Sequence, residues 1–441
     1  MAGTALVLLH HVERGPPERA TSPAVPPTTA DDTAATAALL VVLGDAMIAS
    51  GYTVSQVQTT LRRVLEVGGI PDGEVIVLPT AVFVSVPGQA TTETALAAVG
   101  VSSLRLDQVE GVSRVVTAAE TGEIAPRDAR AALARVRSEA PPFGSVARTL
   151  GYALFSAGLA LILSGGAADV IVAAGLGAVV GAIQLALVES GAATRAVLPL
   201  LCAFLVSTAV FILGRFSEDI GVLAPLVAPL VTFLPGALLT TAVVELSTGQ
   251  MISGAGRLAA GLLQLVLLAL GIVAGAELVG VTSIGSIEAG PLGDFGPWIG
   301  VALFGIGVLV YHCARTSSFG WILLVLYVAY GAQIIGSLFL GPLLSAFVGA
   351  LVMSPVASYV ALRPTGPPTQ VSFLPAFWLL VPGALGLVGL TQLLGNNRAD
   401  ALASLLSMGT TMIGISFGVL IGLAIGTTIS RHLAREVLAR H

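Results

Sequence analysis

Residues 233–246, FLPGALLTTAVVEL, place a Pro-Gly pair and a carboxylate inside a run that otherwise suits hydrocarbon. A proline within a helix removes a backbone N–H and clashes with the preceding turn, so Pro235 and Gly236 predict a break in this span. Backbone groups freed by a break in a bilayer core need partners from protein, water or ligand. The break is therefore a candidate ligand site, and the alternative is a kink that serves packing alone.

The composition is that of a polytopic membrane protein. Hydrophobic residues make up 55% of the 441 and charged residues 10%, with a mean hydropathy of +0.94. A soluble domain carries about 25% charged residues. From residue 146 onward apolar runs of about 20 residues recur, each long enough to cross ~30 Å of hydrocarbon. The two cysteines lie far apart in apolar runs and indicate neither a disulfide framework nor a metal site.

The chain divides into five predicted parts. A disordered tail over 1–32 precedes a small cytoplasmic α+β domain over 33–145. Two five-span units follow, over 146–280 and 297–430, and residues 431–441 form a cytoplasmic tail. The domain is predicted to hold helices over 33–66, 106–121 and 126–137, with strands over 74–86 and within 91–106. The ten spans are predicted over 146–164, 169–188, 195–213, 220–247, 257–279, 297–313, 319–338, 341–361, 372–394 and 406–429.

Arginine in the short loops predicts the orientation, because basic residues mark the cytoplasmic side. The loops expected inside carry Arg195, Arg257, Arg315 and Arg363, whereas those expected outside carry only Arg215 and Arg398. The C-terminal tail adds further arginines. Both termini are therefore predicted to be cytoplasmic in a multi-pass protein of the cell membrane.

The two halves carry traces of an internal repeat. The PGAL of 235–238 recurs as PGAL at 382–385, an offset of 147 residues, and the ten spans superpose in order at this offset. Gly271 and Gly418 match in the same way. Because five spans is an odd number, matched spans cross in opposite directions, which predicts an inverted repeat of the kind found in secondary transporters. Interrupted spans at matched positions, here the fourth and ninth, then form the substrate site.

The fourth span also offers a proton carrier. Thr241, Glu245 and Thr248 share one helical face. An ionisable side chain within a span is costly and is a functional candidate by default. Because burial disfavours a charged carboxylate, Glu245 could take up and release a proton; the alternative is that it faces headgroups or pairs with Arg257. The candidate substrate-binding residues are Pro235, Gly236, Thr240 and Thr241, with their second-half counterparts Pro382, Gly383 and Gln392.

Residues 233–258, FLPGALLTTAVVELSTGQMISGAGRL, resemble the signature of the threonine/serine exporter family. The resemblance extends more loosely over 44–70, the PTAVFVSV stretch and 155–182. It implies a cytoplasmic N-terminal domain, ten spans in two halves, and export of threonine and serine driven by the proton motive force. The residues that match the signature are Pro235, Gly236, Thr240, Glu245, Gly249, Gly256 and Arg257.

Three other functions compete with amino-acid export. A transporter of another small polar metabolite or a dicarboxylate is the second hypothesis, although the nearby arginines fall at span ends. A membrane-embedded hydrolase would need a zinc motif, a Ser/His pair or intramembrane aspartates, which the spans lack, so we expect no enzyme. A channel fits a broken-helix repeat less well. The expected partners are a small polar solute, protons and lipid, with no cofactor, metal or nucleic acid, and homo-oligomerisation stays open.

Overall fold

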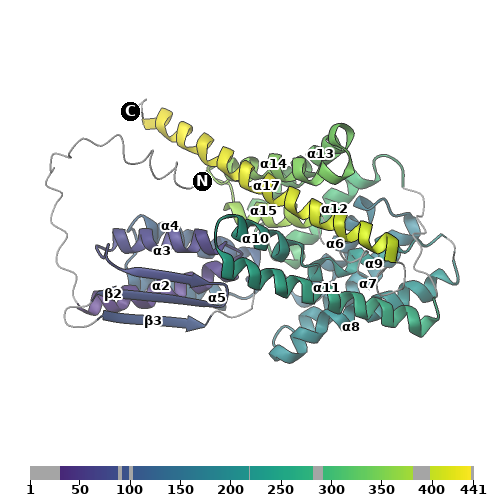
Figure 1. Ribbon diagram of the computed structural model, residues 1–441, viewed down its shortest axis with the longest axis horizontal. Coiled ribbons are helices and arrows are strands. Elements are labelled where there is room, and N and C mark those ends of the chain that lie inside the picture. The colour runs from purple at the N-terminus through teal and green to yellow at the C-terminus, as the bar shows by residue number, and fades with distance from the viewer. Residues whose placement is uncertain are drawn as a thin grey trace.

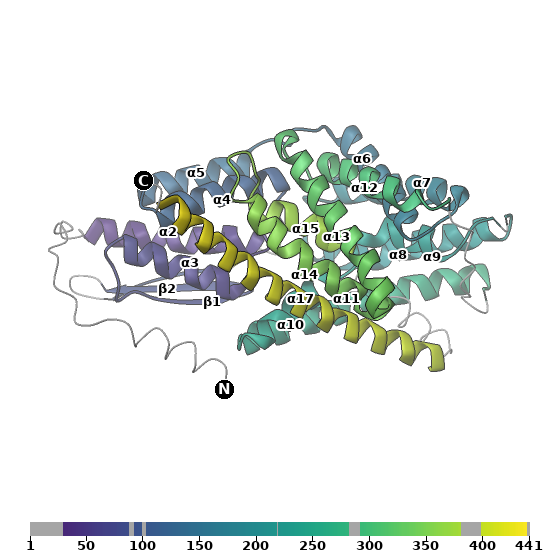
Figure 2. The same cartoon turned by 90° about the horizontal axis from the view of Figure 1, so that it is seen from above.

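The structure, a computed structural model, describes residues 30–87, 92–98, 103–217, 219–281, 292–380 and 398–438. A small α/β region at one end adjoins a long array of helices (Figures 1 and 2). The two parts have separate hydrophobic clusters, one within residues 37–136 and one that runs mainly through the helical array. The C-terminal end of the last helix points toward the end that carries the α/β region in both views.

The α/β part, here called the N-terminal region, covers residues 30–138. It holds α2 (Ala30–Ala49), α3 (Val54–Val67), β1 (Glu74–Leu78), β2 (Ala81–Pro87), β3 (Thr92–Ala98), α4 (Leu106–Glu120) and α5 (Pro126–Ser138). The single helix predicted over 33–66 is wrong, because residues 50–53 interrupt it. Gly51 in this interruption has a φ of +86°, a backbone conformation that residues other than glycine rarely adopt. Thr53 then caps α3 in a capping box with Gln56.

Alternating side chains build the sheet, which is antiparallel in the order β1-β2-β3. Val75, Val77, Val82, Val84 and Val86 are buried on one face. Pro79 lies in the turn between β1 and β2, where its missing N–H interrupts no strand pairing. The stretch predicted as strand over 74–86 thus forms two strands, β1 and β2, and the strand predicted within 91–106 corresponds to β3. The three strands form a meander.

The helical array contains helices close to most of the predicted spans. They are α6 (Ser145–Ile162), α7 (Ala167–Ala186), α8 (Ala192–Gly214), α9 (Leu223–Val227), η1 (Ala228–Phe233), α10 (Gly236–Ser247), α11 (Met251–Val279), α12 (Gly296–Tyr311), η2 (Thr316–Ser318), α13 (Phe319–Leu340), α14 (Pro342–Val360), α15 (Thr369–Leu379) and α17 (Arg398–Leu438). Among the described residues, six helices are long and apolar enough to cross a membrane, and a bent pair makes up to seven.

The helix count supports a polytopic membrane protein, while ten spans and an inverted repeat stay predictions. The sixth and eighth predicted spans correspond to shorter apolar helices, Gly296–Tyr311 and Leu344–Val360. The ninth, predicted over 372–394, continues past α15 into residues outside the described part. Residues 1–29 and 439–441 of the predicted tails also lie outside it, and α17 continues through 431–438.

Glycines bring three helix pairs into close contact. A Cβ added at Gly300 of α12 would lie 2.7 Å from the Gly158 carbonyl oxygen of α6. A Cβ at Gly271 of α11 would lie 2.5 Å from the Leu200 carbonyl oxygen of α8. A Cβ at Gly418 of α17 would lie 2.6 Å from the Phe347 carbonyl oxygen of α14. Since real Cβ atoms do not approach so closely, these backbones can pack in this way only with glycine.

Candidate functional site

The helix break lies at the predicted dipeptide. The segment Leu223–Phe233 and α10 (Gly236–Ser247) are bent by 58° relative to each other. Pro235 is the N-cap residue of α10, and the segment before it ends as the 3₁₀ helix η1. Both Pro235 and Gly236 are buried. The polar backbone that the break exposes therefore lies inside the protein.

Side chains from neighbouring helices satisfy two carbonyl groups of the broken segment. Tyr152 of α6 donates its hydroxyl to the Pro229 carbonyl at 2.9 Å, and Gln264 of α11 donates its side-chain amide to the Phe233 carbonyl at 2.7 Å. An unpaired backbone group in hydrocarbon costs several kcal/mol, so these bonds permit the break. The carbonyl groups next to the Pro-Gly break therefore find their hydrogen-bond partners in a buried tyrosine and a partly buried glutamine.

A polar network continues from the same segment into α7 and α12. Thr232 lies 2.7 Å from the Tyr152 hydroxyl and accepts a bond from the Gln184 amide at 3.2 Å. Tyr311 donates its hydroxyl to the Gln184 side-chain oxygen at 3.1 Å. Gln184 therefore makes interhelical hydrogen bonds within the helical array.

Glu245 is held by an arginine and by a distant backbone N–H group. Its side chain is fully buried, and Arg257 donates through Nε to Oε2 at 3.0 Å. The backbone N–H of Val54, the first residue of α3, donates to Oε1 at 3.1 Å. The predicted alternative of a pair with Arg257 is therefore present. Arg257 belongs to α11, which begins at Met251, so this arginine lies within a helix and not in the loop where the sequence placed it.

Sequence reasoning missed Val54, although a local signal existed. The reciprocal hydrogen bonds of Thr53 and Gln56 form a capping box, which marks the start of a helix. The first N–H groups of a helix have no partner within it and are available to an external acceptor. The sequence shows such a donor at Val54, but it does not show that the acceptor lies 191 residues away.

A cavity of about 100 Å³ lies one helical turn from Glu245. We call it the α10–α15 cavity; its walls are the α2–α3 connection, α10, α15 and α17. Thr240 and Thr241, both predicted substrate-binding residues, line it. Thr240 is 3% exposed, and its hydroxyl has no hydrogen-bond partner among the described residues. A buried hydroxyl without a partner is costly, so a ligand that reached Thr240 from the cavity would supply the missing hydrogen bond.

The other predicted site residues are placed differently. Pro235 and Gly236 begin α10 but are not among the residues that line the cavity. Pro382, Gly383 and Gln392 lie outside the described residues. Sequence reasoning also missed the contribution of α15, where Thr369, Gln370 and Phe373 line the cavity. α15 overlaps the start of the predicted ninth span, and it lines the cavity together with α10, which belongs to the predicted fourth span.

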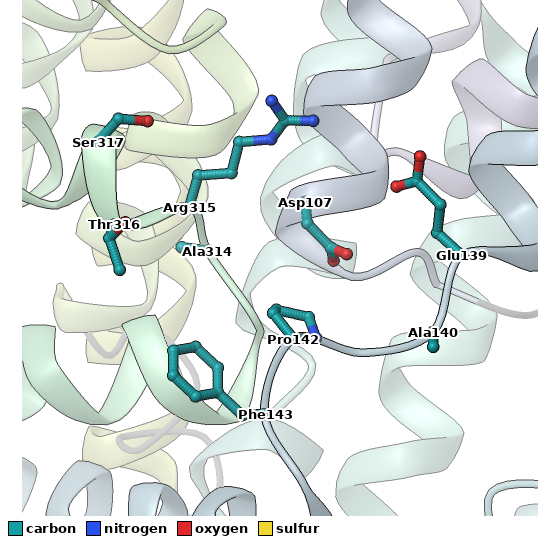
Figure 3. Close-up of a pocket in the computed structure, with 9 residues that line it drawn as sticks. All are labelled: Asp107, Glu139, Ala140, Pro142, Phe143, Ala314, Arg315, Thr316 and Ser317. Atoms are coloured by element: carbon teal, nitrogen blue, oxygen red, sulfur yellow. The ribbon is translucent and has the colours of Figure 1, made fainter.

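A second, more open pocket of about 480 Å³ separates the N-terminal region from the helical array (Figure 3). Arg315 extends across it from the α12–α13 connection and pairs with Glu110 of α4 at 3.4 Å. Beside it, the N–H groups of Leu106 and Asp107 donate to the carbonyls of His312 and Cys313 at 2.9 and 3.1 Å. The N-terminal region therefore contacts the helical array at two separate points, through the first turns of α3 and α4.

These features define a multi-pass helical membrane protein with a broken span beside an internal cavity. Residues 38–279, more than half of the chain, match the protein family described as "Putative threonine/serine exporter". The chain belongs to this threonine/serine exporter family. No curated protein and no solved structure matches it. The family match spans the N-terminal region and the helices as far as α11, and so includes Glu245, Arg257 and the break.

Proposed function

We propose that the protein exports threonine and serine across the cell membrane, driven by the proton motive force. The solute occupies the α10–α15 cavity, between the broken fourth span and the ninth. One observation carries this assignment: Thr240 lines the cavity, and its buried hydroxyl lacks a partner among the described residues. A solute hydroxyl of threonine or serine supplies that partner. Thr241 lines the same cavity, and Pro235 and Gly236 begin the helix that carries both threonines. Pro382, Gly383 and Gln392 are the proposed contributors from the second half.

Equivalent packing in the two halves supports an inverted repeat of five spans, over 146–280 and 297–430. Gly271 of α11 approaches Leu200, Ala203 and Phe204 of α8. Gly418 of α17 approaches Phe347, Ala350 and Leu351 of α14. Each of these four residues in the second half is displaced by the same 147 positions from its first-half equivalent. The third and fifth spans thus pack as the eighth and tenth do, atom for atom at the glycine.

Contacts of the N-terminal region support its placement on the cytoplasmic side, as a domain over 33–145. At one point this region donates a hydrogen bond to Glu245, the ion-pair partner of Arg257. At the other, its Glu110 pairs with Arg315. Arg315, in the α12–α13 connection, marks the inner side by the positive-inside rule. The C-terminal end of α17 points toward the end of the molecule that carries the N-terminal region (Figure 2). Both termini then lie in the cytoplasm.

Glu245 is the proposed proton carrier. In its ionised form it accepts bonds from Arg257 and from the Val54 N–H. Protonation would remove the charge that Arg257 neutralises and weaken both bonds at once. Because Glu245 lies one turn from Thr241, which lines the cavity, a change in its charge would alter the cavity directly. Proton uptake and solute movement could be linked through this short stretch of α10.

Counterflow of labelled threonine in proteoliposomes tests the proposal, with and without an imposed pH gradient. We expect wild type to accumulate threonine against its gradient when protons drive it. We expect Glu245→Gln to exchange threonine but not to accumulate it. Accumulation by the variant would assign the proton to another group. If wild type moves neither threonine nor serine but transports another small polar metabolite, the proposed substrate is wrong and that metabolite takes its place.

A further inference from the structure

The N-terminal region supplies one wall of the α10–α15 cavity. Gly51, Thr53 and Gln56, from the α2–α3 connection and the first turn of α3, line it together with Thr240. Gln56 is exposed and Thr53 partly exposed, whereas Thr240 is buried, so the N-terminal region forms the mouth and α10 the interior. A site confined to the membrane helices would not include these residues.

Three sets of contacts keep this wall in place. The Val54 N–H bonds to Glu245 of α10 at 3.1 Å. Gly51 faces α15, where a Cβ built on it would lie 3.6 Å from Leu374, an ordinary contact distance. The N-terminus of α4 bonds to the carbonyls of residues 312 and 313 on the other side of the region. The wall is therefore anchored to elements of both halves of the helical array.

The capping box does not use the side-chain NH₂ group of Gln56. The Gln56 side-chain oxygen accepts the Thr53 N–H at 3.0 Å, which orients the amide group. Its NH₂ group is a hydrogen-bond donor that the box does not require. A donor held at the mouth, and an unpartnered hydroxyl in the interior, match the carboxylate and hydroxyl of a small hydroxy amino acid.

We propose that Gln56 is a solute-binding residue, which donates from its amide nitrogen to the carboxylate of the exported amino acid. This inference rests on the proposed function, because it takes the α10–α15 cavity to be the solute site. The N-terminal region is then part of the binding site and not only an attached domain. Movement of this region away from α10 would remove one side of the site.

Cysteine labelling tests whether the solute reaches Gln56. The native cysteines, Cys202 and Cys313, are both buried, so a cysteine introduced at an exposed position can be labelled selectively with a maleimide. We expect saturating threonine to slow labelling of Gln56→Cys at least five-fold. Thr59→Cys is the matched control, because Thr59 is exposed on the same helix and does not line the cavity. Its labelling rate should not change with threonine.

A second measurement separates contact from indirect effects. Gln56→Leu should raise the KM for threonine about tenfold, the loss expected for one hydrogen bond to a charged group. Inhibition by threoninol, which lacks the carboxylate, should be the same for Gln56→Leu and wild type. Gln58→Leu, the same change elsewhere on α3, should leave the KM for threonine unchanged.

The two proposals fail in different ways. If wild type transports threonine but Gln56→Cys is unprotected and Gln56→Leu retains its KM, the role of Gln56 is wrong and the proposed function stands. If threoninol inhibition weakens as much as threonine binding, the amide does not bind the carboxylate, and this assignment is overturned. If wild type does not transport threonine or serine, the proposed function fails, and the role of Gln56 fails with it.

Discussion

The backbone N–H of Val54 donates a hydrogen bond to the carboxylate of Glu245, across 191 residues of chain. The bond joins the first residue of α3 to the helix that follows the Pro-Gly break. Glu245 is fully buried and also accepts from Arg257. One carboxylate therefore joins the N-terminal region, α10 and α11 at the edge of the α10–α15 cavity.

Replacing Val54 with proline should remove this bond while α3 stays helical. Proline is favoured at the first position of a helix, and Thr53 already has the extended backbone that a residue before proline requires. A hydrogen bond to a charged group contributes about 1.5–3 kcal/mol, so the contact between α3 and α10 should loosen. Hydrogen exchange should become faster for the amides of residues 51–56 and of α10.

Val54→Ala is the control for that change. It trims the buried side chain of Val54 but keeps the N–H group that Glu245 accepts. Exchange in α10 should then stay at the wild-type rate, even if the core of the N-terminal region is weakened. Equal acceleration in the two variants would show that side-chain packing, and not the N–H group, joins the two parts.

Arg257→Ala should destabilise the protein far more than a surface substitution does. It leaves the buried Glu245 carboxylate without its cation, and removing one partner of a buried ion pair costs about 3–5 kcal/mol. Thermal unfolding in detergent should show a large fall in midpoint. The double variant Glu245→Gln, Arg257→Met removes both charges and should recover part of the loss. No recovery would mean that Arg257 stabilises the protein through other contacts.

Gly271→Ala and Gly418→Ala should lower stability by similar amounts, because each new Cβ meets a backbone carbonyl oxygen at 2.5–2.6 Å. Overpacking of this kind typically costs about 1–3 kcal/mol. Gly256→Ala on α11 is the control, since nothing lies within 4 Å of its added Cβ. Thermal unfolding of the three variants measures the difference. A large effect at only one of the two paired glycines would contradict equivalent packing in the two halves.

Local patterns predicted the helices well and the tertiary contacts poorly. The limits of α6 and the break at Pro235 followed from apolar run length and proline chemistry, which act within a few residues. The interruption of the helix at Gly51 was missed, because one glycine within an apolar pattern does not require a positive φ. The Val54–Glu245 bond depends on the docking of two distant segments, and no periodicity in either one contains that information.

The lining of the α10–α15 cavity was predicted in part for the same reason. Thr240 and Thr241, which line it, were predicted because they follow the break on the same helix. Gln56 and Gln370 line the cavity from segments that carry no motif of their own for this role. Their contribution follows only from the packing of α3 and α15 against α10.

Threonine binding by Thr240→Val tests the central claim most directly. Valine has nearly the shape of threonine but lacks the hydroxyl, which has no partner among the described residues. Removing an unsatisfied buried hydroxyl should not destabilise the protein, and its thermal midpoint should stay the same or rise. Threonine binding should weaken about tenfold, whereas binding of alanine should be unchanged. Unchanged threonine affinity in the stable variant would contradict the assignment of the α10–α15 cavity as the solute site.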